Sequence, residues 1–150
     1  MTDYELTQRV IGCAMKVHSA LGPGLLESAY KECLCFELMR AGLFAEKEKP
    51  MPLVYSKVRL DCGYRVDIMV ERRLILEIKA VEAINDVHLA QVLTYLKLAD
   101  LRLGLIMNFH VLHLRNGYAT LSISTTTLPP LRNPPRPLRL MSYPKNARHE

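Results

Sequence analysis

Residues 64–80 read YRVDIMVERRLILEIKA, and this stretch decides the fold. Apolar residues alternate with other side chains on both sides of the polar triplet at 71–73, and this period of two is typical of β-strands. Because the triplet is short, the two runs predict a hairpin of two antiparallel strands, one over residues 64–70 and one over residues 74–80.

The expected hairpin places two carboxylates face to face. Pairing across the loop puts Asp67 directly opposite Glu77, where Cβ atoms on one sheet face lie about 4.5–5.5 Å apart and like charges destabilise. A divalent cation would reverse this interaction, since Mg²⁺ takes oxygen ligands and is typically held by one or two carboxylates. Lys79, two residues beyond Glu77, projects from the same face. The alternative is an ordinary solvent-exposed face on which Lys79 and Arg65 neutralise the acids.

Two helices are expected before these strands. Apolar residues recur every three or four positions over residues 4–21, as in an amphipathic helix, and the turn Gly22-Pro23-Gly24 ends it. A second helix is expected over residues 25–41, followed by Gly42 in the position of a C-terminal cap. Glu27 lies on the same side of this second helix as several apolar residues. A carboxylate is therefore placed on a face expected to be largely buried.

Strands are also expected on both sides of the hairpin. Period-two alternation predicts a strand over residues 53–60, and the apolar run at residues 103–109 is typical of a buried strand. Asn-Gly at 116–117 is the commonest two-residue hairpin turn and predicts a last hairpin. With the helix described next, the expected order is helix, helix, three strands, helix, strand and C-terminal hairpin.

The helix after the hairpin carries polar residues at helical spacing. It is capped by Asn85 or Asp86 and runs to about Ala99. Gln91 and Tyr95 are one turn apart and share a stripe on its surface. Such a stripe is often merely exposed to solvent, so its meaning depends on the motifs that precede it.

Length and composition favour one globular domain. The chain has 150 residues, of which 49% are hydrophobic and 23% charged, and this composition excludes wholesale disorder. No apolar run approaches the roughly 18 residues needed to cross a bilayer, and the acidic start does not resemble a signal peptide. We therefore expect a cytoplasmic protein that does not associate with membranes. The four cysteines form no C-x-x-C pair and are expected to be reduced thiols.

The net charge of +5 is concentrated near the C-terminus. Residues 128–150 hold five of the 20 basic residues, six of the nine prolines and a single acid. We expect a folded domain over residues 1–127, followed by an extended arm. Arg132, Arg136 and Arg139 of this arm are candidates for nucleic-acid binding, since a basic arm can grip phosphates through counterion release. The alternative is a solvated terminus without a partner.

The order of the polar motifs resembles that of a known group of enzymes. Asp67 is followed by the E-x-K triplet at 77–79 and then by Gln91 and Tyr95. This order resembles the PD-(D/E)xK nuclease superfamily, in the branch that has a Q-x-x-x-Y motif after the lysine. Residues 24–30, GLLESAY, are similar to the G-x-x-E-x-x-Y signature of a small-protein family within that superfamily. The resemblance implies an α/β fold with a restriction-endonuclease-like core, in which a mixed central sheet is flanked by helices.

The resemblance also implies a role for each polar residue of the core. Asp67 and Glu77 would be ligands of Mg²⁺ or Mn²⁺, and Glu27 would be an additional carboxylate for the metal or for a water molecule. Lys79 would orient the attacking water and stabilise developing negative charge. These four residues are the predicted centre of a phosphodiester-hydrolysing site.

The remaining predicted roles are supporting ones. Gln91 would orient the lysine or the substrate, whereas Tyr95 and His18 would either support the catalytic groups or be satisfied structural residues. The implied partner is nucleic acid, with DNA favoured over RNA, and the oligomeric state is open. The competing hypothesis is a catalytically inactive nuclease-like fold that serves as a nucleic-acid or protein interaction module.

Overall fold

The chain folds around one mixed β-sheet. The computed structural model describes residues 1–123 and 140–142. The elements, in chain order, are α1 (Asp3–Leu21), α2 (Glu27–Arg40), β1 (Ala45–Pro50), β2 (Leu53–Tyr55), β3 (Val58–Leu60), β4 (Arg65–Val70), β5 (Leu74–Lys79), α3 (Asp86–Ala99), β6 (Leu103–Asn108), the 3₁₀-helix η1 (Leu114–Asn116), β7 (Tyr118–Ile123) and β8 (Leu140–Ser142).

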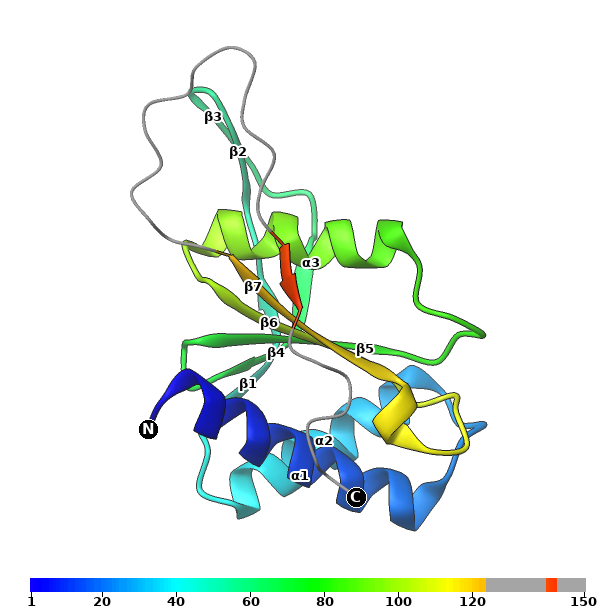
Figure 1. Cartoon of the computed structure of the whole chain (residues 1–150). Helices are drawn as coiled ribbons and strands as arrows, with labels where there is room; N and C mark the ends of the chain where they lie inside the picture. The colour runs from blue at the N-terminus through cyan, green and yellow to red at the C-terminus, as the bar shows by residue number, and fades with distance from the viewer. Residues whose placement is uncertain (124–139, 143–150) are drawn as a thin grey trace.

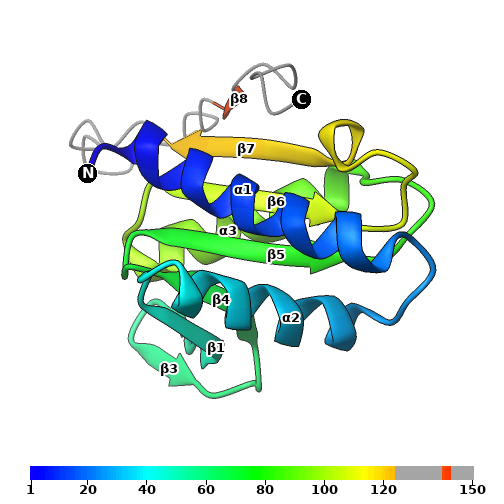
Figure 2. The same cartoon turned by 90° about the horizontal axis from the view of Figure 1, so that it is seen from below.

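The sheet has helices on both faces. Its six strands follow the order β1-β4-β5-β6-β7-β8, while β2 and β3 form a separate two-stranded ribbon. The pair β5 and β6 is parallel, and the other neighbouring strands of the sheet are antiparallel. Helices α1 and α2 lie against one face and α3 lies against the other (Figures 1 and 2). The expected α/β fold with a mixed sheet flanked by helices is confirmed.

Two of the helices begin with reciprocal side-chain caps. The Thr2 hydroxyl accepts the Glu5 N–H while the Glu5 carboxylate accepts the Thr2 N–H, which fixes the start of α1. The same arrangement joins Asn85 and His88 at the start of α3, so the cap expected at Asn85 is confirmed. The three helices expected from the sequence are all present, with ends within two residues of the expected ones.

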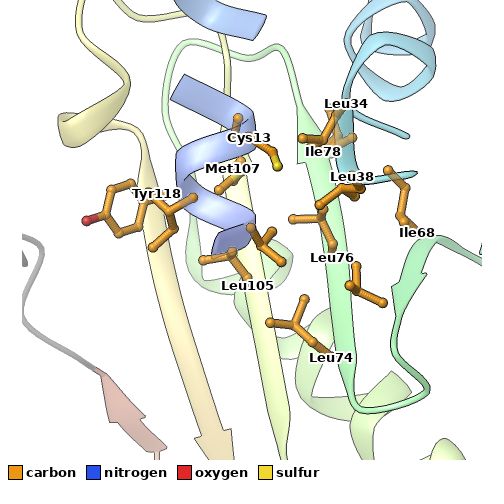
Figure 3. Packing of buried hydrophobic residues seen from close by; sticks show 14 of the residues in the cluster. Cys13, Leu34, Leu38, Ile68, Leu74, Leu76, Ile78, Leu105, Met107 and Tyr118 are labelled. Atoms are coloured by element: carbon orange, nitrogen blue, oxygen red, sulfur yellow. The ribbon is translucent and has the colours of Figure 1, made fainter. Parts of the chain in front are cut away.

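The apolar faces meet the sheet in two clusters. On the side of α1 and α2, Leu34 shares a cluster with Leu76 and Ile78 of β5, and these side chains point into the same layer (Figure 3). On the other side, Val92 of α3 packs in a cluster with Ile75 of β5. Alternate residues of β5 therefore belong to two different cores, and the strand is buried on both faces.

The strand expected over residues 53–60 is wrong. This stretch forms the β2–β3 ribbon, because Ser56 adopts a left-handed conformation (φ 54°) and reverses the chain. The strand that joins β4 and β5 in the main sheet is instead β1, which comes before them in the chain and pairs with β4. Four of its six residues, AEKEKP, are charged, as is common for an edge strand, and so it carries no apolar alternation.

The hairpin expected around residues 116–117 is also wrong. Strand β7 pairs antiparallel with β6, and the connection between them contains η1. Gly117 has φ −113°, which differs from the left-handed backbone of the expected turn. Its role is close approach, since an added Cβ would lie 2.4 Å from the carbonyl oxygen of Asn108.

Part of the C-terminal prediction lies outside the described residues. Arg132, Arg136 and Arg139 belong to that part, and so their predicted role stays a prediction. Within residues 128–150 the structure describes β8 alone, which pairs with β7 at the edge of the sheet. Each helix in the described part of the chain is too short or too polar to cross a bilayer.

Gly104→Ala should destabilise the fold because α3 packs directly on β6 at this position. An added Cβ would lie 2.8 Å from Val92 Cγ1 and 3.2 Å from Leu96 Cδ1. Such overpacking costs about 1–3 kcal/mol, and Tm should fall by about 2–4 °C for each kcal/mol. Thermal melting followed by circular dichroism measures the change. Gly12→Ala in α1 is the control, because a Cβ there meets no atom within 4 Å and should raise Tm slightly.

Candidate active site

The two predicted acids face each other where the β4–β5 ladder stops. The ladder pairs residues 68–70 with residues 74–76 in the expected register. Beyond the ladder, the two strands are joined by hydrogen bonds from backbone N–H groups to carboxylate side chains. The Asp67 N–H donates to Glu77 Oε1 (3.2 Å), and the Ile78 N–H donates to Asp67 Oδ2 (2.8 Å). The predicted opposition of Asp67 and Glu77 is therefore confirmed, and both carboxylates form hydrogen bonds across the two strands.

Glu77 is a buried carboxylate beside a second acid. Its exposed fraction is 4%. Burial, followed by the charge of Asp67, raises the pKa of Glu77 to about 8, while the Asp67 N–H and the charge of Lys79 act in the opposite direction. Without a cation nearby, Glu77 therefore holds a proton more strongly than an ordinary carboxyl does. This is the electrostatic penalty expected from two carboxylates at opposed positions.

The two carboxylates match the ligand chemistry of a hard divalent cation. Each uses one oxygen to accept a backbone N–H, and among the described residues no further N–H group donates to Asp67 Oδ1 or to Glu77 Oε2. Mg²⁺ and Mn²⁺ favour such oxygen ligands, and Mg²⁺ commonly takes only one or two carboxylates together with water and substrate phosphate. Asp67 and Glu77 thus fit a divalent cation whose remaining ligands come from solvent or substrate.

Lys79 lies on the same side of β5 as Glu77. Residues two apart on a strand share a face, and Ile75 of this series packs on the α3 side of the sheet. The ammonium is half-buried and, within the described part of the chain, forms no ion pair. It is therefore available to a group placed next to Glu77.

Helix α2 brings a third carboxylate to the end of β5. Glu27 is the first residue of α2, and its Oε1 accepts the N–H of Ala80 (3.0 Å). The side chain is exposed rather than buried as expected. In the described residues, no three His, Cys, Asp or Glu side chains are close enough together to hold a metal ion. Glu27 thus contacts Ala80, the residue that follows Lys79. Within the described residues, it does not form a metal-binding cluster with Asp67 and Glu77.

Helix α3 contributes a glutamine and a tyrosine. Gln91 Nε2 donates to the Tyr95 hydroxyl (3.2 Å). Tyr95 is 5% exposed, and its pKa is raised first by burial and then by the charges of Glu77 and Asp67. Tyr95 is therefore within electrostatic range of both acids, and the exposed Gln91 is held beside it.

His18 belongs to a different part of the molecule. It is buried near the end of α1, and its Nε2 lies 2.8 Å from the carbonyl oxygen of Val111. Its ring also packs near that of Phe109 (6.1 Å between centroids). These contacts attach α1 to the segment that follows β6, which is the contact pattern of a structural histidine.

Sequence reasoning missed one charged pair beside the acids. Lys31 Nζ lies 2.7 Å from Glu48 Oε1, and the side chain of Lys31 is only 15% exposed. Its pKa is raised first by Glu48 and also by the charge of Asp67. The available signal was the spacing, because Lys31 follows Glu27 by one helical turn and so shares its face.

Comparison with known proteins identifies a family. The family model described as the PD-(D/E)XK nuclease superfamily matches residues 4–121, a range that includes Glu27, Asp67, Glu77, Lys79, Gln91 and Tyr95. No curated protein and no solved structure matches the chain.

Glu77→Gln should raise Tm in metal-free buffer, and the gain should depend on pH. Since the pKa of Glu77 is raised from 4.5 to about 8, the folded wild type binds more protons than the unfolded chain between these values. Its free energy of unfolding then falls by up to about 1.4 kcal/mol per pH unit as pH rises through this window. The variant lacks this loss, so the Tm difference should be small near pH 5 and largest above pH 8.

Melting curves with EDTA from pH 5 to 9 measure this difference. The exposed Glu82 is the matched control, and Glu82→Gln should give no pH-dependent gain. An equal gain for Glu77→Gln at both ends of the pH range would contradict the like-charge assignment.

Proposed function

Because the chain belongs to the PD-(D/E)XK nuclease superfamily, we propose that it is a metal-dependent nuclease that hydrolyses phosphodiester bonds, in DNA rather than RNA. The observation that carries the proposal is the opposed pair Asp67 and Glu77. A buried carboxylate facing a second acid has no benefit for stability, but it suits a cation. We also propose the GxxExxY branch of the superfamily, on the spacing of Gly24, Glu27 and Tyr30.

Asp67 and Glu77 would hold a Mg²⁺ or Mn²⁺ ion. Such an ion, when bound, polarises a phosphate oxygen and lowers the pKa of water. The chain's own contribution is to fix both carboxylates through the N–H groups of Asp67 and Ile78, so that their free oxygens stay in place. Glu27, which accepts the N–H of Ala80, would orient a water molecule at the end of β5.

Lys79 and Gln91 would act on the substrate. The Lys79 ammonium holds the attacking water near the phosphate and offsets the negative charge that develops in the transition state. Gln91 orients Lys79 or the phosphate with its side-chain amide, and Tyr95 supports Gln91 through their hydrogen bond. Arg132, Arg136 and Arg139 would grip the nucleic-acid backbone away from the reacting phosphate.

Lys79→Met should lose cleavage without losing the fold. Removal of one charged group that stabilises a transition state lowers kcat by about 10²–10³-fold. The measurement is cleavage of supercoiled plasmid, labelled single-stranded DNA and labelled RNA, each with Mg²⁺ or Mn²⁺. Lys97→Met, which removes an exposed lysine from the last turn of α3, is the control and should cleave like wild type. Equal cleavage by both variants would reject Lys79 as a catalytic residue.

Asp67→Asn should separate a metal site from an ordinary acidic pair. Without metal at pH 9, above the raised pKa of Glu77, the variant should melt above wild type, because the charge opposite the ionised Glu77 is gone. With Mn²⁺ only wild type should gain Tm strongly, since a ligand that binds the folded state stabilises it. Asp61→Asn, at an exposed position before β4, should behave as wild type. If wild type neither responds to Mn²⁺ nor cleaves, the inactive interaction module is the better hypothesis.

A further inference from the structure

A lysine from α2 approaches the acids from a second element. Lys31 lies one helical turn after Glu27 and is held by Glu48 of β1 at 2.7 Å. Its side chain is 15% exposed, whereas the Glu48 side chain is 59% exposed. The charge of Asp67 acts on the Lys31 ammonium, so the two groups are within electrostatic range. Glu48 lies on β1 between the two residues that pair with the neighbours of Asp67, so its bridge holds the Lys31 ammonium on the α2 side of Asp67.

The backbone of Glu48 is unusual at the position opposite Asp67. In the β1–β4 ladder Lys47 pairs with Ile68 and Lys49 pairs with Val66, while Glu48 and Asp67 between them are not a ladder pair. Glu48 has φ 51°, a left-handed conformation that is costly for a residue other than glycine. A regular strand would place a second carboxylate against Asp67. The observed conformation instead directs Glu48 to Lys31.

We propose that Lys31 is a built-in counter-cation of the site, held by Glu48 so that it weakens metal binding to the free protein and attracts the phosphates of nucleic acid. The inference rests on the proposed function. Lys31 stabilises the charge of Asp67 while no divalent cation is present, and it repels that cation when it arrives. An anionic substrate offsets this repulsion, so that metal and nucleic acid favour each other's binding. Lys31 is thus a positioning residue that acts through Asp67 and the substrate phosphate.

The chain offers a matched lysine for comparison. Lys47 of β1 pairs with Glu32 of α2 at 2.6 Å, so it joins the same two elements. Both side chains of this pair are exposed, and Asp67 is not among the groups that shift the pKa of Lys47. Lys47→Met changes the net charge as Lys31→Met does, but away from the acids.

The test measures two affinities on the full chain. Mn²⁺ binding is followed by isothermal titration calorimetry, and binding of a labelled DNA oligonucleotide is followed by fluorescence anisotropy in EDTA. Lys31→Met should bind Mn²⁺ about tenfold more tightly than wild type, since one charge has been removed close to a divalent cation. The same variant should bind the oligonucleotide more weakly. Opposite signs distinguish this role from a structural one, because a damaged fold would weaken both affinities.

Three variants complete the comparison. Lys31→Arg keeps the charge and should bind Mn²⁺ as wild type does, and Lys47→Met should leave Mn²⁺ affinity unchanged. Glu48→Gln should weaken Mn²⁺ binding, because the charge of Lys31 is then no longer offset. Lys31→Gln, which also removes the charge, decides the question if Lys31→Met fails to fold.

The outcomes separate this inference from the proposed function. If wild type binds Mn²⁺ and Asp67→Asn does not, the metal site stands. Unchanged or weaker Mn²⁺ binding by Lys31→Met then overturns the counter-cation alone, as does an equal effect of Lys47→Met. If wild type binds no Mn²⁺ with or without the oligonucleotide, the proposed function fails and the counter-cation fails with it.

Discussion

The site depends on the point at which β4 and β5 stop pairing. Up to the pair of Ile68 and Leu76 the strands share a regular ladder, and beyond it Glu77 accepts the N–H of Asp67 while Asp67 accepts the N–H of Ile78. The carboxylates thereby serve as acceptors for two backbone N–H groups that the ladder does not pair. This explains how a buried glutamate beside another acid is tolerated. β5 is buried on both faces, so the apolar contacts of its other residues offset the unfavourable charge pair.

The turn before α2 is explained by its contacts with the centre of the molecule. The Tyr30 hydroxyl donates to the Gly22 carbonyl (2.6 Å) and accepts the Leu25 N–H (3.1 Å), so it fixes the turn that leads into α2. Its ring stacks on Phe109, 4.5 Å between centroids, and the N–H of Phe109 donates to the carbonyl of Lys79. The G-x-x-E-x-x-Y spacing thus has a physical meaning, because the same tyrosine that closes the turn also sets the start of α2, and with it Glu27, against the end of β5.

Short-range sequence patterns predicted the parts of the structure that depend on residues close together in the chain. The helices followed from apolar periodicity and caps, and the register of Asp67 against Glu77 followed from the short loop between two alternating runs. Edge strand β1 could not be predicted in this way, because its charged sequence carries no apolar period and its pairing with β4 is a long-range contact. Lys31 was missed for a related reason. Its importance comes from Glu48, and the left-handed backbone that directs Glu48 toward it is not visible in the sequence.

The electrostatics of the free protein argue for metal and substrate binding together. The pKa of Glu77 is raised to about 8, Lys79 acts on Glu77, and Lys31 interacts with Asp67. A lone divalent cation would therefore have to ionise a carboxyl that holds its proton strongly and overcome two positive charges. Phosphate groups reverse each of these costs, since they pair with the lysines and supply oxygen ligands. Residues that would oppose the proposed metal on its own would thus favour it in the presence of nucleic acid, which links the proposed metal site to the proposed substrate.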